Sequence, residues 1–345
     1  MISRRKLILM LTITVVYFFS DTLFKAGYFK QITNTKLESN EIIRGIYGPE
    51  DMEWDNENNV IYVSSSDRRS TYKGIWKSSD GVYQLNPLSG EFHKMHTNWD
   101  KEFHPHGISY FQESGQKYLY TVNHFKTENS IELFCIRADS LIHIKSYAHA
   151  LLHSPNDVVG VGVDQFYATN DHGNTSRLGV QVENYLRMPY SYLVYYDGTK
   201  YIKALEGLVY ANGVQISNDD SSLFVSHTIG REIIVLDRNR ITGELFEVER
   251  INMLAGVDNI NVDHENNLWV AAHPQLLKFS SHANDSSNHS PSQVYKLTPS
   301  QNGYQVKKTF ESDGALISGS SVALFAQGKL YIGGVFDDKI VSFTP

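Results

Sequence analysis

The residues best suited to chemistry in this sequence are small polar and charged side chains that open short β-branched segments. They recur at six places, which read Glu50-Asp51-Met52, His106-Gly107-Ile108, Asn156-Asp157-Val158, Asn212-Gly213-Val214, Asp258-Asn259-Ile260 and Gly319-Ser320-Ser321. Asn and Asp before a strand are most often turn formers. If the six openings met on one axis, they would instead supply many oxygen ligands and no sulfur, which is cation-binding chemistry.

Each opening is followed by a short segment that has the composition of a β-strand. These segments have an aromatic residue at their centre and read Ile61-Tyr62-Val63, Leu119-Tyr120-Thr121, Phe166-Tyr167-Ala168, Leu223-Phe224-Val225, Leu268-Trp269-Val270 and Leu330-Tyr331-Ile332. Such β-branched and aromatic segments, bounded by Gly, Asn, Asp and Ser, predict strands and turns. Residues 41 to 345, divided among six units, give about 51 residues each, near the length of a propeller blade. We therefore predict an all-β fold: one six-bladed β-propeller with four-stranded antiparallel blades.

The propeller places the openings together. Because the innermost strand of every blade lines the central channel, corresponding positions of the repeats converge on one axis. The residues expected there as oxygen donors are Glu50, Asn156, Asn212, Asp258 and Asn259. Calcium takes six to eight oxygen ligands and accepts neutral amides. Zinc would require clustered His or Cys, which these positions lack. The pattern therefore favours a calcium site in the channel over an accidental run of turns.

At these residues the sequence resembles the paraoxonase/arylesterase family, calcium-dependent lactonases and esterases related to the gluconolactonase superfamily. The resemblance is carried by Gly48-Pro49-Glu50-Asp51, Pro105-His106-Gly107-Ile108-Ser109, Val122-Asn123-His124, Asn156-Asp157-Val158-Val159, Tyr167 through His172, Ala211-Asn212-Gly213 and Val257 through Asp263. Single motifs of this kind are weak signals, whereas seven in register are specific. The resemblance reaches over residues 41–275, and the repeats continue it to the end of the chain.

The resemblance implies two calcium ions and a histidine pair. The five channel residues named above would hold an exposed catalytic calcium, and Asp51, Asp157 and the backbone carbonyl of Ile108 would hold a buried structural one. His106 and His124 match the family's pair that activates the attacking water. The alternative for these two histidines is a purely hydrogen-bonded role in the channel. His104, two residues before His106, leaves the choice of base open.

The implied function is calcium-dependent hydrolysis of lactones and aryl esters, with a small-molecule lactone or ester as the substrate. A related alternative is a sugar-lactone hydrolase of the gluconolactonase type. A different class is a non-catalytic ligand-binding propeller, which would retain the fold without metal-dependent turnover. A strictosidine-synthase-like enzyme would use a catalytic carboxylate without calcium, and the full set of five oxygen donors argues against it.

The start of the chain carries an export signal. Arg4, Arg5 and Lys6 precede an uncharged run from Leu7 to Phe19, which is the pattern of a secretory signal and is short for a permanent membrane span. We expect residues 1–27 to be a signal peptide or an uncleaved anchor, and residues 28–345 to be the propeller. The protein is then exported, with membrane association through this segment as an option. A buried core helix is the alternative.

Composition limits the remaining choices. The chain has 31 basic and 38 acidic residues and a net charge of −7, and without Lys/Arg runs it lacks the basic footprint of a nucleic-acid binder. Its single cysteine, Cys135, excludes an intrachain disulfide. The ring is therefore expected to close by pairing of a segment near Glu41–Gly45 with Ile340–Phe343.

Two longer connections carry expectations of their own. Residues 173–191 are expected to form a lid with an apolar wall, or a surface loop with a helical turn. Residues 280–292 are expected to form a solvated loop.

Overall fold

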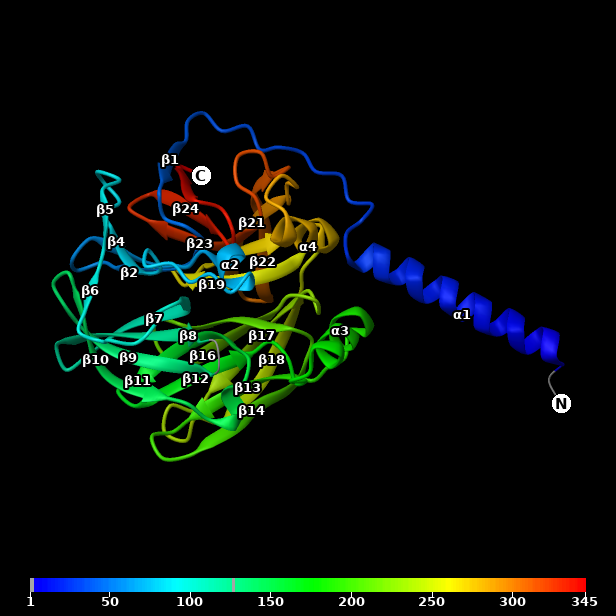
Figure 1. Ribbon diagram of the computed structural model, residues 1–345, viewed down its shortest axis with the longest axis horizontal. Coiled ribbons are helices and arrows are strands. Elements are labelled where there is room, and N and C mark those ends of the chain that lie inside the picture. The colour runs from blue at the N-terminus through cyan, green and yellow to red at the C-terminus, as the bar shows by residue number, and fades with distance from the viewer. Residues whose placement is uncertain (1–2, 126–127) are drawn as a thin grey trace.

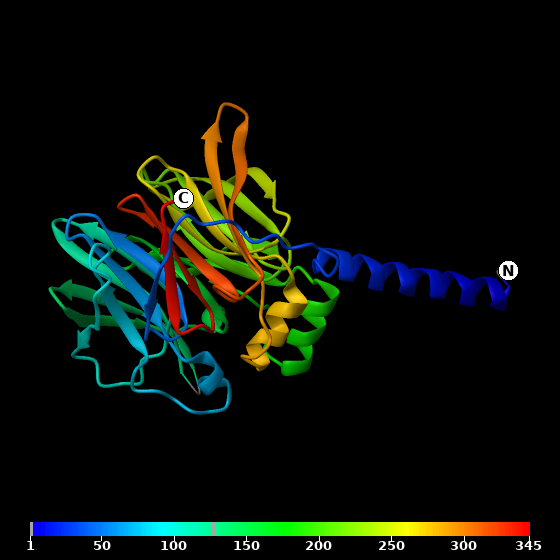
Figure 2. The ribbon, with the colours of Figure 1, turned by 90° about the horizontal axis from the view of Figure 1, so that it is seen from above.

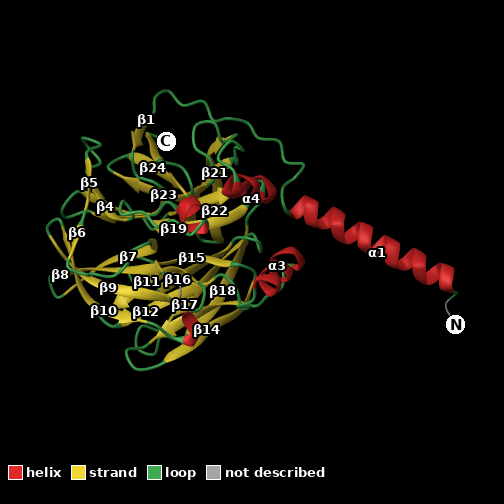
Figure 3. Ribbon diagram, in the orientation of Figure 1, coloured by secondary structure: helices red, strands yellow, loops and turns green. Residues whose placement is uncertain are grey.

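The computed structural model describes residues 3–125 and 128–345 and shows six antiparallel sheets arranged as blades around one axis (Figure 1). Strands dominate the chain, and the few helices lie outside the blades (Figure 3). The predicted six-bladed β-propeller is therefore confirmed. Five of the sheets have four strands, while the second blade gains a fifth short strand, β6 (His96–Thr97), which pairs in parallel with its outermost strand.

The blades follow one another in chain order, each running from the channel outward. The first three are β2 (Pro49–Asp55), β3 (Val60–Ser65), β4 (Gly81–Leu85), β5 (Phe92–Lys94); β7 (Pro105–Glu113), β8 (Gln116–His124), β9 (Asn129–Arg137), β10 (Ser140–Tyr147); and β11 (Pro155–Gly162), β12 (Gln165–Asn170), β13 (Ser191–Tyr196), β14 (Tyr201–Leu208). The others are β15 (Ala211–Ile216), β16 (Ser222–His227), β17 (Glu232–Arg238), β18 (Leu245–Asn252); β19 (Gly256–Val262), β20 (Leu268–His273), β21 (Ser292–Ser300), β22 (Gly303–Ser312); and β23 (Ser320–Ala326), β24 (Lys329–Gly334), β25 (Lys339–Phe343) with β1 (Glu41–Arg44).

The ring closes by strand pairing, as predicted. Strand β1 forms the outer edge of the last blade and runs antiparallel to β25, with Glu41 opposite Ser342 and Arg44 opposite Lys339. The N-terminal and C-terminal parts of the propeller are thus hydrogen-bonded into one sheet. Cys135 is buried in β9 as a free thiol, so the closure depends on this ladder and on the side chains packed beneath it.

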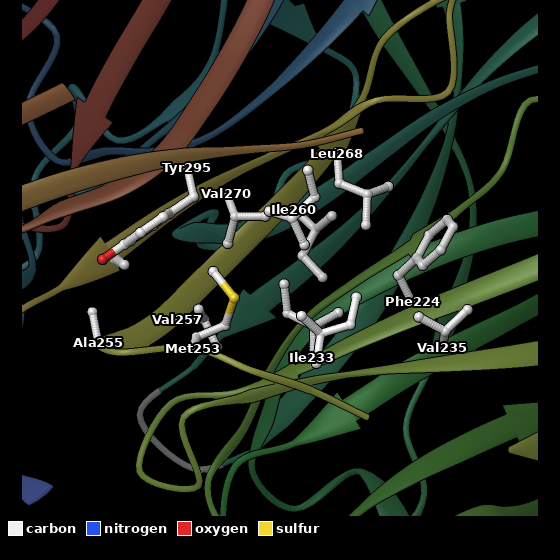
Figure 4. Packing of buried hydrophobic residues seen from close by; sticks show 13 residues of the cluster. Phe224, Ile233, Val235, Met253, Ala255, Val257, Ile260, Leu268, Val270 and Tyr295 are labelled. Atoms are coloured by element: carbon white, nitrogen blue, oxygen red, sulfur yellow. The ribbon is translucent and has the colours of Figure 1, made fainter. Parts of the chain in front are cut away.

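The hydrophobic core is divided into wedges between neighbouring blades. Each of six clusters of buried apolar side chains joins two successive blades, including the last and the first. In one wedge, Phe224 and Val235 of the fourth blade face Leu268 and Tyr295 of the fifth (Figure 4). Burial of this apolar area holds the blades together. The axis itself is left to polar residues, because no apolar cluster fills it among the described residues.

A register shift marks the opening of every innermost strand. In the first blade, Pro49 lies opposite Ser65, but Met52 lies opposite Val63, so β2 carries one extra residue. The same one-residue excess occurs in the other five blades, at Pro105/Ile108, Pro155/Val158, Ala211/Val214, Val257/Ile260 and Ser320/Val322. Such a bulge bends the strand and re-aims its side chains. Two adjacent residues of one opening can then both reach neighbouring blades around the axis.

In the part of the chain that the structure describes, four α-helices and one 3₁₀ turn accompany the blades: α1 (Arg4–Lys25), α2 (Arg68–Tyr72), η1 (Ala150–Leu152), α3 (Arg177–Leu186) and α4 (Leu276–Asn284). Helices α3 and α4 both lie at the end of the propeller near α1 (Figure 2). The segment 173–191 therefore contains a helix. The prediction of a solvated loop for residues 280–292 is wrong in its first part, because α4 continues through Asn284 and its His282 is only 2% exposed.

Helix α1 projects away from the propeller (Figure 1). None of its residues is buried, so the alternative of a core helix is wrong. Among the described residues, it is the one helix that is long and apolar enough to cross a membrane, judged by length and composition, and a signal sequence would meet the same criterion. Its end is fixed to the domain, since Asp21 Oδ2 lies 2.6 Å from Arg187 Nη2 after α3.

Closure by β1 can be tested with prolines. Because amides alternate in direction along a strand, prolines at both Ile42 and Ile43 must remove at least one hydrogen bond to β25. We expect the double variant Ile42→Pro/Ile43→Pro to lower the free energy of unfolding by about 1–3 kcal/mol, measured by denaturant titration. The matched variant Glu38→Pro/Ser39→Pro, in the exposed linker before β1, is expected to unfold like the wild type. Equal stability of both variants would contradict closure by this ladder.

The contact between the second and third blades gives another prediction. A methyl group on Gly107 in β7 would overlap Asp157 Oδ1 and lie 2.5 Å from the Asp157 Cα in β11. We expect Gly107→Ala to cost about 1–3 kcal/mol of stability through overpacking, measured by denaturant unfolding. Gly162→Ala is the matched control on β11, because its nearest contact would be the flexible Gln165 Oε1 at 3.3 Å. A Gly107→Ala protein as stable as this control would show that the openings are not tightly packed.

Candidate active site

The channel opens into a cavity of about 440 Å³ between the strand openings and the helices. The residues from the channel that line it are Glu50, His106, Asn156, Asn212 and Asp258. Helices α3 and α4 supply walls that include Tyr185, Leu276, Leu277 and Phe279, and the end of α1 contributes Thr22, Lys25 and Ala26. The cavity is therefore polar at its channel end and largely apolar toward the helices. It is the place where the predicted site residues meet solvent.

The structure brings together all five predicted oxygen donors of the exposed site. Each is at most 5% exposed, and each keeps one side-chain oxygen that has no hydrogen-bond partner in the protein: Glu50 Oε2, Asn156 Oδ1, Asn212 Oδ1, Asp258 Oδ1 and Asn259 Oδ1. An unsatisfied buried polar atom is costly, so native proteins contain few of them. Five buried oxygen acceptors without a hydrogen-bond partner at one channel mouth are the arrangement expected where a cation binds through oxygen ligands.

Neighbouring groups orient these donors by their other atoms. Asn259 donates from Nδ2 to the Glu50 Oε1 at 3.0 Å, and Asn212 donates from Nδ2 to Thr228 Oγ1 at 3.0 Å. His273 Nε2 lies 2.6 Å from Asp258 Oδ2. The amide nitrogens thus find protein partners, which turns the amide oxygens toward the channel. Such outer contacts are typical of positions that hold a metal ligand in a fixed orientation.

The donor chemistry suits calcium. Two carboxylates and three amides are hard oxygen ligands, and the set contains no thiolate and no imidazole. Within residues 3–125 and 128–345, no group of three or more His, Cys, Asp or Glu side chains is placed to hold a metal ion, which counts against a zinc-type cluster. Asn side chains are not among those four residue types, so a calcium site built largely from Asn is compatible with this result.

The ionisation of the two channel carboxylates, Glu50 and Asp258, depends on their buried neighbours. Burial alone would raise the pKa of Glu50, but the charge and hydrogen bond of His106, together with Arg68 and Asn259, outweigh burial and hold this pKa at about 2. The carboxylate is therefore ionised at neutral pH. Burial raises the pKa of Asp258, and the hydrogen bond from His273 only partly opposes that increase. An approaching cation would stabilise both ionised carboxylates.

The second predicted pair, Asp51 and Asp157, lies deeper among the openings. Asp51 Oδ2 accepts a hydrogen bond from Ile108 N at 2.8 Å, and Asp157 Oδ2 accepts one from Val214 N at 2.7 Å, so each carboxylate links two blades. Burial, followed by repulsion from Asp157, raises the pKa of Asp51 well above its usual range, and burial does the same for Asp157. Two like charges in a buried place require a proton or a cation.

The two predicted histidines form a directed hydrogen-bond chain. Asn129 donates from Nδ2 to the His153 carbonyl at 2.8 Å, which turns its Oδ1 toward His124 Nδ1 at 2.9 Å. This arrangement places a proton on His124 Nδ1, so His124 Nε2 accepts from His106 Nδ1 at 2.7 Å. The remaining nitrogen, His106 Nε2, lies 3.5 Å from Glu50 Oε1 at the channel end of the cavity. Burial, and next the charge of His106, lower the pKa of His124 to about 4, which keeps that ring neutral.

His104, the third candidate for the base, turns away from the cavity. Its Nδ1 lies 2.8 Å from Asp80 Oδ2, and its ring packs on Trp76 with centroids 4.1 Å apart. The backbone of His104 supports the histidine pair instead, because its carbonyl accepts a hydrogen bond from the His124 amide at 3.3 Å. The structure therefore separates His104 from the two histidines that share the channel.

Three further residues of the site are not assigned by the sequence patterns. Arg68 of α2 is 6% exposed, lines the cavity and points at Glu50. His273 pairs with Asp258 and stacks on Phe279 of α4, with ring centroids 3.8 Å apart. His172 pairs with Asp171 at 2.6 Å beside α3. His172 and His273 do stand inside or next to the motifs quoted above, but nothing local distinguishes a histidine of the site from one of the core.

The helical wall is tied to the site by specific contacts. Ser176 caps α3 by accepting a hydrogen bond at Oγ from Gly179 N at 3.1 Å. Buried Glu183 accepts hydrogen bonds from the amides of Gly173 and Asn174, which fixes the helix to the loop before it. His172 Nε2 reaches Asn184 Oδ1 of α3 at 3.1 Å. The segment expected as a lid thus forms an ordered part of the cavity wall.

Comparison with known proteins agrees with this architecture. A sequence model of the Arylesterase family matches residues 86–341. The chain is 32% identical to serum paraoxonase/arylesterase 1 of Homo sapiens over 323 residues, which are 89% of each protein. It is 34% identical to serum paraoxonase/arylesterase 2 of Homo sapiens over 242 residues, or 68% of this chain and 67% of that protein.

Solved structures show the same fold at low sequence identity. A luciferin-regenerating enzyme aligns with a TM-score of 0.55 and 14% identity, over 89% of this chain and 96% of that one. A gluconolactonase from Xanthomonas campestris aligns with a TM-score of 0.54 and 16% identity, over 90% and 93%. The calcium-binding protein regucalcin from Agrobacterium tumefaciens gives 0.54 and 10%, over 88% and 93%. The matches of the family model and of the curated relatives decide the assignment: this chain belongs to the paraoxonase/arylesterase family of ester hydrolases.

Proposed function

We propose that this protein is a calcium-dependent hydrolase of lactones and aryl esters. The observation that carries the proposal is the set of five buried side-chain oxygens that lack partners at the channel mouth. A cation at that point would satisfy all of them at once. Membership of the paraoxonase/arylesterase family supports the reaction class, and the regucalcin structure is described as that of a calcium-binding protein on the same fold.

In this proposal the channel holds two ions. The exposed one is held by Glu50, Asn156, Asn212, Asp258 and Asn259, and when bound it polarises the substrate carbonyl and stabilises the negative charge that develops on its oxygen. The buried ion is held by Asp51, Asp157 and the carbonyl of Ile108, and it has a structural role. The two carboxylates of the buried pair already link the first blade to the second through Ile108 N and the third to the fourth through Val214 N, so a cation there would lock the channel.

The base is His106. Its Nδ1 is engaged by His124, and its Nε2 lines the cavity 3.5 Å from Glu50 Oε1, the carboxylate that the calcium ion would engage. A water placed between His106 Nε2 and the substrate carbonyl would lose its proton to that nitrogen during attack. The chain of His124 and Asn129 fixes the tautomer of His106 and stabilises the imidazolium that forms. The proton then passes to the leaving alcohol or, in a lactone, to the ring oxygen that is released.

The apolar wall of α3 and α4 favours substrates with hydrophobic groups over bare sugar lactones. Tyr185, Leu276 and Phe279 offer contact area beside the channel mouth, and apolar walls with a few polar groups are typical of small-molecule sites. A sugar-lactone hydrolase is the second candidate, because a gluconolactonase shares the fold. A non-catalytic ligand-binding propeller is the third. Chelation separates this last candidate from the first two.

We also propose that the propeller acts outside the cytoplasm. Residues 1–27 would direct export as a signal peptide or remain as an anchor, and residues 28–345 would form the hydrolase domain. The apolar helix α1, which contains no buried residue, supports either role. Its position at the wall of the cavity would hold the site close to a membrane if the segment is retained.

The calcium role predicts a loss of both metal binding and activity on chelation. We expect the full-length protein in detergent micelles to hydrolyse phenyl acetate and aliphatic lactones with calcium, and to lose that activity in excess chelator. Asn212→Ala and Asp258→Ala each remove one unpartnered oxygen and should weaken calcium binding at least tenfold, measured by isothermal titration calorimetry. Asn302→Ala, at an exposed turn, is the matched control. Hydrolysis that persists in chelator, or unchanged calcium affinity in both variants, would rule the mechanism out.

The base assignment predicts a different signature. His106→Gln keeps a polar side chain of similar size but removes the nitrogen that accepts the proton, so kcat should fall about 10²–10⁴-fold while calcium binding is retained. Measurement of lactone hydrolysis together with calorimetric calcium titration tests both parts. Asn129→Ala should reduce kcat less, because it only loosens the tautomer of His124. A His106→Gln enzyme with the full lactonase rate would transfer the role of base to another group.

A further inference from the structure

Arg68 is a buried cation whose carboxylate partner is a proposed metal ligand. It stands at the first residue of the short helix α2, is 6% exposed and lines the cavity. Its Nη2 lies 3.8 Å from Glu50 Oε2, which is the oxygen of Glu50 without a hydrogen-bond partner. At this distance the two groups form an ion pair, but they are too far apart for a hydrogen bond.

The guanidinium is held in place by neutral groups. Arg68 donates from Nη1 to the Gly48 carbonyl at 3.2 Å and from Nη2 to the Pro105 carbonyl at 3.3 Å. These carbonyls precede the openings that carry Glu50 and His106, so Arg68 is fixed between the metal-ligand position and the base. A side chain held in this way binds a partner without a further loss of rotamer entropy. Backbone carbonyls satisfy its donors but do not neutralise its charge.

Metal binding changes the charge balance of the cavity. Glu50 and Asp258 are the acidic residues that line it, and the cationic ones are Lys25, Arg68 and Arg187, of which Lys25 and Arg187 both pair with Asp21. Without metal, the three cations and three carboxylates balance. A calcium ion held by Glu50 and Asp258 adds two positive charges and engages the only carboxylate within 4 Å of Arg68 among the described residues. The loaded cavity is then cationic, with its buried positive charge at Arg68.

A buried charge without a partner is strongly unfavourable. We propose that Arg68 binds an anionic group of the substrate, so that the preferred substrates are lactones or esters that carry a carboxylate near the scissile carbonyl. This inference rests on the proposed function, because calcium must occupy Glu50 for Arg68 to be released. A planar guanidinium binds carboxylate through charge-assisted hydrogen bonds. Lys25 at the cavity wall attracts the same group during approach.

The test compares matched substrates that differ in charge. One pair is 4-acetoxybenzoate and methyl 4-acetoxybenzoate, followed by release of acetate, and the other is 5-oxotetrahydrofuran-2-carboxylate and γ-valerolactone. We expect the wild-type, calcium-loaded, full-length protein to show a higher kcat/KM for the anionic member of each pair. In Arg68→Gln the ratio of anionic to neutral kcat/KM should fall about tenfold or more, while Arg68→Lys retains part of it. Lys73→Gln, an equal charge change on the exposed residue after α2, should leave the ratio unchanged.

Binding without turnover gives an independent measurement. In calcium-loaded wild type, benzoate should compete with methyl 4-acetoxybenzoate and bind in calorimetry more tightly than benzamide, and Arg68→Gln should remove that difference. This comparison in the wild type remains informative if circular dichroism shows that a variant does not fold. An unchanged substrate ratio in Arg68→Gln, an equal loss for both members of each pair, or equal binding of benzoate and benzamide would overturn the proposal. If the proposal about Arg68 fails but the wild type still hydrolyses the neutral ester in a calcium-dependent way, the proposed function stands. If the wild type shows no calcium-dependent hydrolysis of the neutral ester, the proposed function itself is refuted.

Discussion

The extra residue at the opening of each innermost strand is the constraint on which the site depends. A regular strand alternates its side chains between two faces, so neighbours such as Glu50 and Asp51 would point in opposite directions. The one-residue bulge between Pro49 and Met52 breaks that alternation where the strand enters the channel. Glu50 then contacts Asn259 of the fifth blade, while Asp51 accepts from Ile108 of the second. One local irregularity, repeated around the ring, thus generates two layers of oxygen donors.

The polar channel is possible because stability comes from elsewhere. The six apolar wedges between blades bury the aromatic and branched side chains, and the β1–β25 ladder closes the ring. The axis can therefore hold residues that would destabilise an ordinary core, such as Asp51 and Asp157, whose pKa values are raised by burial. In the proposed mechanism, a bound cation relieves the repulsion between these buried carboxylates, and this relief contributes to the affinity for the cation. Fold stability and metal affinity are consequently supplied by different parts of each blade.

The cavity combines groups from distant parts of the chain. Its floor comes from the strand openings, its apolar wall from α3 and α4, and its rim from the end of α1, which is held by the Asp21–Arg187 ion pair. Arg68 joins the first and second openings through the Gly48 and Pro105 carbonyls. The channel end of the cavity is therefore charged, while the helical end combines apolar side chains such as Leu276 and Phe279 with the cations Lys25 and Arg187. In the proposed function, substrate selectivity depends on the helices and on Arg68, which are separate from the five oxygen donors.

Sequence periodicity determined the six blades and the channel-lining openings, because alternating strands and turns are local signals repeated six times. The single cysteine, which excludes a disulfide between the ends, led to the expectation that strand pairing closes the ring. Four donors, Glu50, Asn156, Asn212 and Asp258, could be named from equivalent positions in the repeat, and the fifth, Asn259, is the next residue after Asp258. Contacts that no repeat encodes required the tertiary structure: the pairing of Arg68 with Glu50, the His273–Asp258 contact, and the Asn129 contact that orients His124 and His106. The end of helix α4 also required the tertiary structure, because its Ser- and Asn-rich sequence resembles a loop, whereas in the fold its residue His282 is buried. These features depend on which side chains meet across blades, and sequence spacing does not contain that information.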